Sequence, residues 1–70
     1  MSLNNEILLG RIPRDAKNEW KIIRGNYWNK EVVDIRLYSN NTPTSKGVRF
    51  NLEELAILKQ ILQKVDDEEE

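Results

Sequence analysis

Apolar and polar residues alternate in the middle of this chain, in the pattern of a half-buried β-strand. Val33, Ile35 and Leu37 fall on one face of such a strand, and the residues between them fall on the other. Three further stretches are short and rich in aliphatic, β-branched or aromatic residues, which also predicts strands. The four predicted strands cover residues 6–12, 19–28, 31–38 and 46–50.

Turn-forming residues separate the predicted strands. Residues 13–15 predict the first turn, residues 29–30 predict a tight second turn, and residues 39–45 predict a polar loop. In the short strand after that loop, alternation places Val48 and Phe50 toward the core.

The last third of the chain has a helical period. Asn51 is a good N-cap, and Glu54 three residues later completes a capping box. The apolar positions that follow form a stripe wider than one small sheet requires. Either part of this stripe packs on the chain's own sheet and the rest on a second copy, or the chain has a single thick core. The first alternative predicts a dimer interface at Leu55, Leu58, Ile61 and Leu62.

The order of elements predicts an α+β fold with an antiparallel sheet followed by one C-terminal helix. One helix can cover only one face of the sheet, so the other face is open to solvent or to a ligand. We expect a flexible leader over residues 1–5, a single domain over 6–65 and a disordered acidic tail over 66–70.

A chain of 70 residues buries a marginal core and usually needs a disulfide, a metal or a partner subunit. It has no cysteine, which excludes disulfides, and no histidine, which removes the commonest general base and metal ligand. We therefore expect no metal, no cofactor and no enzymatic activity, and we expect oligomerisation to supply stability. The absence of cysteine fits a cytoplasmic protein, in a bacterial or phage-infected cell, or a nuclear one in a eukaryote. We expect no membrane span and no signal peptide.

The net charge of −1 hides an uneven distribution. Five of the twelve acidic residues are the last five, and the rest of the chain has 11 basic against 7 acidic residues. The stretch 20–50 holds six basic residues, two acidic residues and all five aromatic ones. Basic and aromatic residues mixed in this way are typical of single-strand nucleic-acid binders, although edge strands also carry lysine for solubility. The acidic tail is either a solvated end or a competitor of nucleic acid for the basic face.

Two short motifs and the helix after them carry a resemblance. The motifs are the run Val-Asp-Ile-Arg-Leu-Tyr at 33–38 and the run Lys-Gly-Val-Arg-Phe-Asn at 46–51. Their order and spacing resemble the transcriptional coactivator family of positive cofactor four, over roughly residues 20–65. Trp28-Asn29 looks like the compact prokaryotic members. The resemblance implies a homodimer of curved four-stranded antiparallel sheets that binds single-stranded or melted DNA with little sequence preference.

The resemblance also implies roles for particular residues. Tyr27 matches an aromatic residue that stacks on bases, with Trp28 beside it. The basic positions of the family match Lys30, Arg36 and Lys46. Eukaryotic members have a tryptophan just after the third strand's tyrosine, where this chain has Ser39.

Strand parity adds further candidates on the face opposite Val33. Tyr27 and Trp28 adjoin, so we expect one ring in the core and one exposed, and we favour Tyr27 as the exposed one. Two alternatives remain: a bulge at Gly25-Asn26 exposes both rings, or both rings pack. Arg36 can contact phosphate, or it can pair with Asp34 or with a neighbouring strand. The predicted nucleic-acid-binding residues are Tyr27, Trp28, Lys30, Arg36, Tyr38, Lys46, Lys21 and Arg49.

The function that we predict is single-stranded DNA binding, in transcription regulation or other DNA transactions. Two alternatives remain open. The same sheet or helix face can dock a transcription or replication protein, and the same surface can bind single-stranded RNA, because base stacking and phosphate contacts are common to both nucleic acids.

Overall fold

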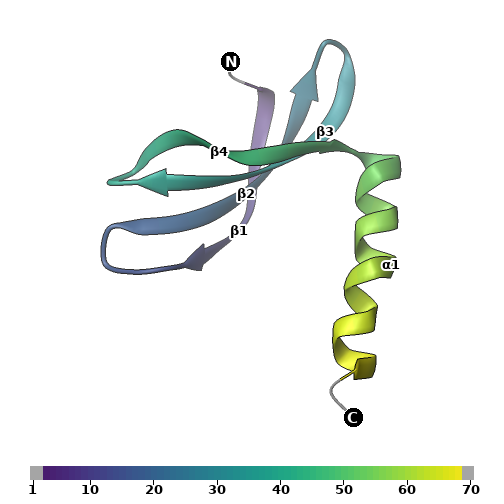
Figure 1. The fold of residues 1–70 in the computed structure, drawn as a ribbon. Coiled ribbons are helices and arrows are strands. Elements are labelled where there is room, and N and C mark those ends of the chain that lie inside the picture. The colour runs from purple at the N-terminus through teal and green to yellow at the C-terminus, as the bar shows by residue number, and fades with distance from the viewer. Residues whose placement is uncertain (1–2, 69–70) are drawn as a thin grey trace.

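Four strands and one helix make up the computed structural model, which describes residues 3–68, apart from the side chains of residues 67 and 68. The strands are antiparallel neighbours in chain order, and the helix follows the last of them (Figure 1). This arrangement confirms the α+β fold class. The elements are β1 (Asn4–Pro13), β2 (Asn18–Tyr27), β3 (Lys30–Ser39), β4 (Thr42–Asn51) and α1 (Leu52–Glu68).

Two-residue turns close the second and third hairpins. Trp28 and Asn29 have φ angles of 54° and 62°, and Asn40 and Asn41 have φ angles of 52° and 66°. Positive φ at both central residues is the geometry of a type I′ turn, whose twist matches that of the flanking strands. The predicted turn at residues 29–30 is therefore one residue too late, and most of the predicted loop over 39–45 belongs to β3 and β4.

The N-terminus takes part in the fold from Leu3 onward. Leu3 is buried, and β1 begins at Asn4. Gly25 in β2 leaves the room for this, since a Cβ on Gly25 would lie 2.8 Å from the Cβ of Leu3. The predicted flexible leader is wrong for residues 3–5, and residues 1–2 lie outside the described part of the chain.

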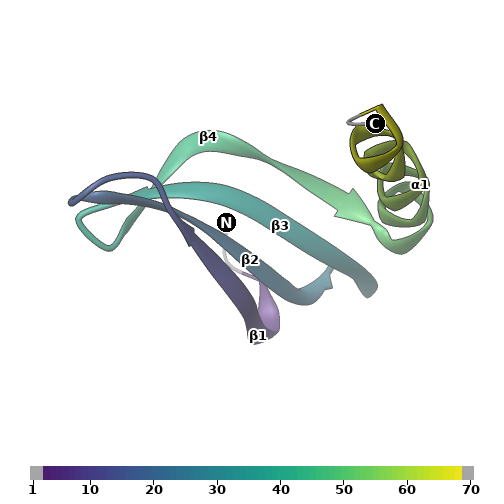
Figure 2. The same cartoon turned by 90° about the horizontal axis from the view of Figure 1, so that it is seen from below.

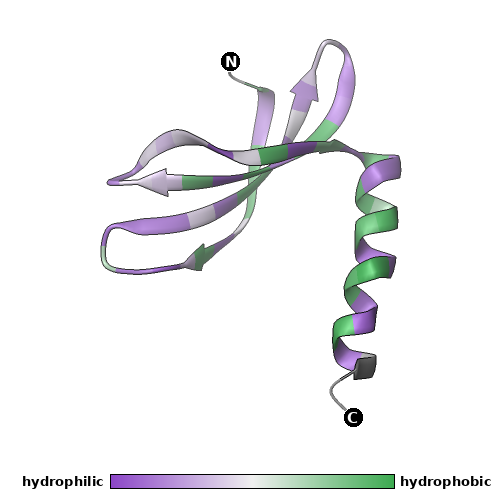
Figure 3. Ribbon diagram, in the orientation of Figure 1, coloured by the Kyte–Doolittle hydropathy of each residue, from purple (hydrophilic) through white to green (hydrophobic). Residues whose placement is uncertain are grey.

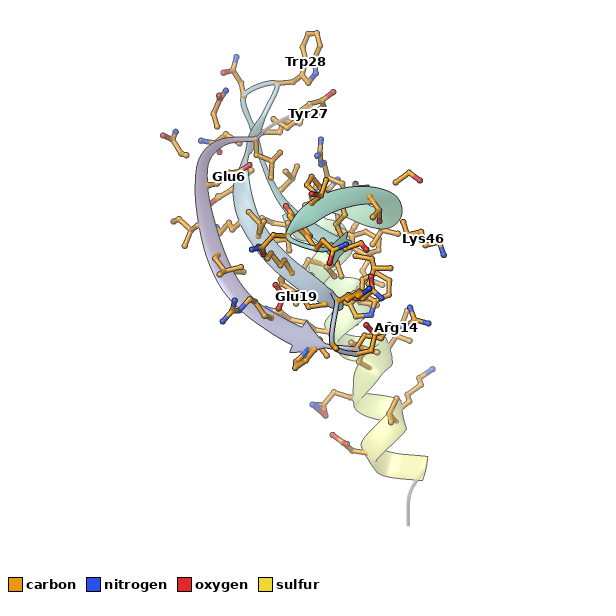
Figure 4. All side chains as sticks on the ribbon, turned by 90° about the vertical axis from the view of Figure 1, so that its left-hand side faces the viewer. Glu6, Arg14, Glu19, Tyr27, Trp28 and Lys46 are labelled. Carbon is orange, nitrogen blue, oxygen red and sulfur yellow. The ribbon has the colours of Figure 1, made fainter. Side chains whose placement is uncertain are left out.

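The sheet is bent (Figures 2 and 4), and both of its faces carry buried apolar residues. Leu3, Ile23 and Val32 form a cluster on one face, against which Tyr27 and Tyr38 pack. Val33 and Leu37 are buried on the opposite face. We predicted a single core face, and the difference arises because Leu3 covers the face that strand parity left open.

The capping box at the start of α1 is confirmed. The Asn51 amide donates to Glu54 Oε1 at 3.0 Å, and the Glu54 amide donates to Asn51 Oδ1 at 2.7 Å. The helix runs to Glu68, so the prediction of a disordered tail is wrong for residues 66–68. Residues 69–70 lie outside the described chain.

The helix does not cover the sheet. It projects beyond the end of β4, and it contacts only β3 and β4 (Figures 1 and 2). Leu55 and Leu58 are half-buried, whereas Ile61 and Leu62 are each 53% exposed. Our expectation that the helix covers one sheet face is therefore wrong.

A large apolar surface remains open on the side of the sheet that bears Val33. Apolar and polar residues alternate along the helix, and further apolar residues lie on the strands (Figure 3). Val48, which we expected in the core, is 47% exposed. We call these residues the apolar surface: Ile7, Leu9, Ile12, Val48, Leu52, Ile57, Ile61, Leu62 and Val65. No helix in residues 3–68 is long and apolar enough to cross a membrane.

Candidate nucleic-acid interface

Strand pairing gathers most of the predicted residues on one face of the sheet, which we call the hollow face. Lys21 pairs with Arg36 across β2 and β3, and Asp34 pairs with both Ile23 and Arg49. Directly paired residues lie on the same face, so the parity that placed Lys21, Arg36 and Arg49 together is confirmed. Six of the eight predicted residues lie there: Lys21, Tyr27, Lys30, Arg36, Tyr38 and Arg49.

An open hollow of about 640 Å³ occupies this face. Residues from all four strands or their ends line it, because the sheet bends around it (Figure 4). Polar and aromatic groups dominate its walls. Those that matter most for the chemistry are Glu6, Tyr27, Asp34, Arg36, Tyr38 and Arg49.

Asp34 organises the two arginines of the hollow. Its carboxylate is 5% exposed, and it accepts hydrogen bonds from Arg36 Nε at 3.0 Å and Arg36 Nη2 at 3.1 Å. Arg49 Nε donates to the same carboxylate at 3.3 Å. Arg36 Nη1 donates to the Thr44 carbonyl at 2.9 Å. Of the three alternatives for Arg36, the structure shows pairing with Asp34 and with the neighbouring strand β4.

This network also shifts the pKa of Arg36. Hydrogen bonding to Asp34 raises the pKa of Arg36 above its ordinary value, while burial acts in the opposite direction. Two guanidinium groups on one carboxylate leave the cluster with a net positive charge. The hollow therefore has fixed, pre-oriented cationic groups at its centre.

Each tyrosine of the hollow lies next to a cation. The guanidinium carbon of Arg49 is 4.7 Å from the ring centroid of Tyr27, and Lys21 Nζ is 4.4 Å from that of Tyr38. Lys21 Nζ also lies 3.9 Å from Glu19 Oε2. Such cation–π contacts hold each cation over the face of its ring.

Trp28 is the most exposed aromatic side chain of the described chain. It is 76% exposed at the tip of the β2–β3 hairpin, whereas Tyr27 is half-buried against the core cluster (Figure 4). We favoured Tyr27 as the exposed ring, and that prediction is wrong because Trp28 occupies a turn position to which strand parity does not apply. The two rings meet edge to face, with centroids 6.1 Å apart.

The backbone of Trp28 is in a conformation that a bulky residue rarely adopts. Its φ of 54° lies in the left-handed region, which costs an ordinary residue roughly 1–2 kcal/mol. Among residues 3–68, the four other non-glycine residues with positive φ are all asparagines, which tolerate this region well. Trp28 therefore adopts a backbone conformation that favours asparagine. Backbone strain of this kind is often found at functional sites.

Neither Lys30 nor Lys46 lines the hollow itself. Lys30 pairs with Tyr27 at the hairpin end and is exposed. Lys46 on β4 is also exposed and points away from the sheet (Figure 4).

Glu6 is a residue of the hollow that sequence reasoning missed. Burial raises the pKa of Tyr38 above its ordinary value, and the charges of Glu6 and Asp34 raise it further. Glu6 and Tyr38 line the same hollow. No sequence signal could have placed it, because β1 has register irregularities between Asn4 and Ile7 and between Leu8 and Gly10, which break the two-residue period.

Neither a metal site nor a known relative indicates the function of this surface. Within residues 3–68, no group of three or more acidic, histidine or cysteine side chains could hold a metal ion. The chain matches no protein-family model, no curated protein and no solved structure.

Proposed function

We propose that this protein is a non-catalytic single-stranded DNA-binding protein of the positive cofactor four type. It acts as a homodimer in transcription regulation or another DNA transaction. The observation that carries the proposal is the placement of Trp28, an exposed indole held in a costly conformation beside the hollow. Its neighbours Tyr27 and Lys30 supply a second ring and a cation.

The bound strand runs along the hollow face. A base stacks on the indole of Trp28, and such stacking contributes about 1–3 kcal/mol per base. Phosphates meet Lys30 and Lys46, which are exposed, and the positive cluster around Asp34 attracts the backbone. Because every base has a flat face, stacking of this kind gives little sequence preference.

The apolar surface supports the dimer. A chain of this size with so much exposed apolar area is poorly stable alone, and large exposed apolar patches usually mark interfaces. Of the four predicted interface residues, Leu55 and Leu58 are half-buried, and Leu55 faces the chain's own sheet. Ile61 and Leu62 are available to a second copy, together with Ile57 and Val65.

The same apolar surface favours one rival function, the docking of a transcription or replication protein. The two functions differ in which face matters. DNA binding depends on the rings and cations of the hollow face, whereas protein docking depends on the apolar surface alone.

Fluorescence anisotropy of a labelled 20-nucleotide thymidine strand tests the proposal. We expect tight binding that duplex DNA of equal length does not displace, and a loss of about tenfold in Trp28→Ala. Lys59→Ala is the matched control, because Lys59 lies on the helix away from the hollow face. The affinity should fall with salt, with a slope near 0.7 per phosphate neutralised.

A strand that does not bind at low salt would overturn the proposal and leave protein docking as the favoured function. An RNA strand of the same sequence, run in parallel, tests the RNA alternative. Binding RNA more tightly than DNA would make the natural ligand RNA.

A further inference from the structure

Glu6 places a negative charge inside a surface that we propose to bind an anionic strand. Its carboxylate lines the hollow, and Oε2 accepts only a long hydrogen bond of 3.4 Å from the Leu3 amide. Among the described residues it forms no ion pair, although Arg36 and Arg49 line the same hollow. A carboxylate here repels phosphate, but it is a strong acceptor for N–H donors.

Arg36 offers the complementary chemistry. A guanidinium group has five N–H donors, and the bonds to Asp34 and Thr44 use three of them. Two donors remain on a side chain that is fixed in place and lines the hollow. The hollow therefore presents a fixed donor group and an acceptor group to the same ligand.

The size and walls of the hollow suit a flat aromatic ligand. Its volume of about 640 Å³ lies within the range of small-molecule sites, about 300–1,000 Å³. The rings of Tyr27 and Tyr38 form part of its walls. Aromatic walls with polar groups on the rim are the arrangement that binds unstacked bases of a single strand.

We propose that the hollow takes one base turned out of the bound strand and that it prefers guanine. This inference rests on the proposed function and adds a base preference at one position per protomer. Guanine has two adjacent donors, N1–H and the N2 amino group, which match the two oxygens of Glu6. Its adjacent acceptors O6 and N7 match the guanidinium of Arg36, the commonest specific contact to guanine.

The other bases fit this pair of groups less well. Cytosine and adenine each have a single amino donor for the carboxylate. Thymine has one N–H between two carbonyl oxygens, so a carbonyl would face the carboxylate of Glu6. Most of the strand is then held without regard to sequence, while a guanine sets its position on the protein.

The test compares a 20-nucleotide thymidine strand with the same strand carrying one central guanine. For the wild-type protein we expect about tenfold tighter binding to the guanine strand. In Glu6→Gln we expect the preference to fall below twofold, while affinity for the thymidine strand stays the same or rises because a repulsive charge is gone. Glu53→Gln, which removes the same charge from the helix, should keep the tenfold preference.

An inosine strand identifies the contact. Inosine lacks the N2 amino group. Wild-type protein should therefore bind the inosine strand with little preference over the thymidine strand, and Glu6→Gln should bind the inosine and guanine strands equally. Equal wild-type affinity for the guanine and thymidine strands would overturn this inference and leave the proposed function intact. Failure to bind either strand would overturn the proposed function itself. Loss of thymidine-strand binding in Glu6→Gln would show a structural role for Glu6 and would also contradict the inference.

Discussion

Arg49 lies over the ring of Tyr27, and the same guanidinium is hydrogen-bonded to the buried carboxylate of Asp34. Three strands therefore contribute to one rigid unit, with Tyr27 on β2, Asp34 on β3 and Arg49 on β4. A ligand that binds there meets groups whose positions are already fixed, so little side-chain entropy is lost on binding. In the proposed interface, this unit forms part of the wall of the hollow, and Trp28 is exposed at the hairpin tip beside it.

The conformation of Trp28 predicts a conflict between stability and binding. Replacing it with asparagine, which tolerates positive φ, should raise the free energy of unfolding by about 1 kcal/mol. The same change should weaken single-stranded DNA binding about tenfold, because a stacking ring is lost. Urea unfolding and anisotropy on the same preparation measure both quantities. A variant that is both less stable and equally tight in binding would contradict this account of the hairpin tip.

The exposed stripe of the helix predicts how the proposed dimer can be broken. Ile61→Glu puts a charge in the centre of the stripe, so we expect a shift from dimer to monomer in sedimentation at micromolar concentration. Gln60→Glu adds the same charge on the polar side of the helix and should leave the dimer unchanged. A wild-type protein that sediments as a monomer would show that the apolar surface serves another partner.

The surroundings of Tyr38 predict a change at alkaline pH. Burial, followed by the charges of Glu6 and Asp34, raises its pKa above the ordinary value of 10.0 in the folded state. The phenol therefore stabilises the fold fully below pH 10, and this contribution is lost as the pH rises through the folded pKa. The difference between the ultraviolet titration curves of wild type and Tyr38→Phe reports Tyr38 alone. Its midpoint should lie above 10.0, and a midpoint at or below that value would contradict the packing described for the hollow.

Local patterns in the sequence were sufficient to predict the element types. The reciprocal hydrogen bonds of Asn51 and Glu54 follow from their spacing, because a capping box is made by residues three apart. The alternation along β3 also predicted which side chains would lie beside Asp34 and Arg36. These features depend on neighbours in the chain, which the sequence contains directly.

The features that the sequence did not predict depend on residues far apart in the chain or on irregular backbone. Leu3 is buried because Gly25 of β2 leaves space for it, and no local pattern links the two residues. Glu6 enters the hollow because β1 is irregular. The open position of the helix depends on packing between α1, β3 and β4, and an apolar stripe alone does not specify which surface it meets.

The most direct test of the central claim uses the fluorescence of Trp28 itself. In a Trp20→Phe variant Trp28 is the only tryptophan, so its emission reports whether a base stacks on it. We predict saturable quenching as a 20-nucleotide thymidine strand is added, and recovery of the emission when salt is raised. Binding of the strand without any change in Trp28 emission would contradict the proposed interface.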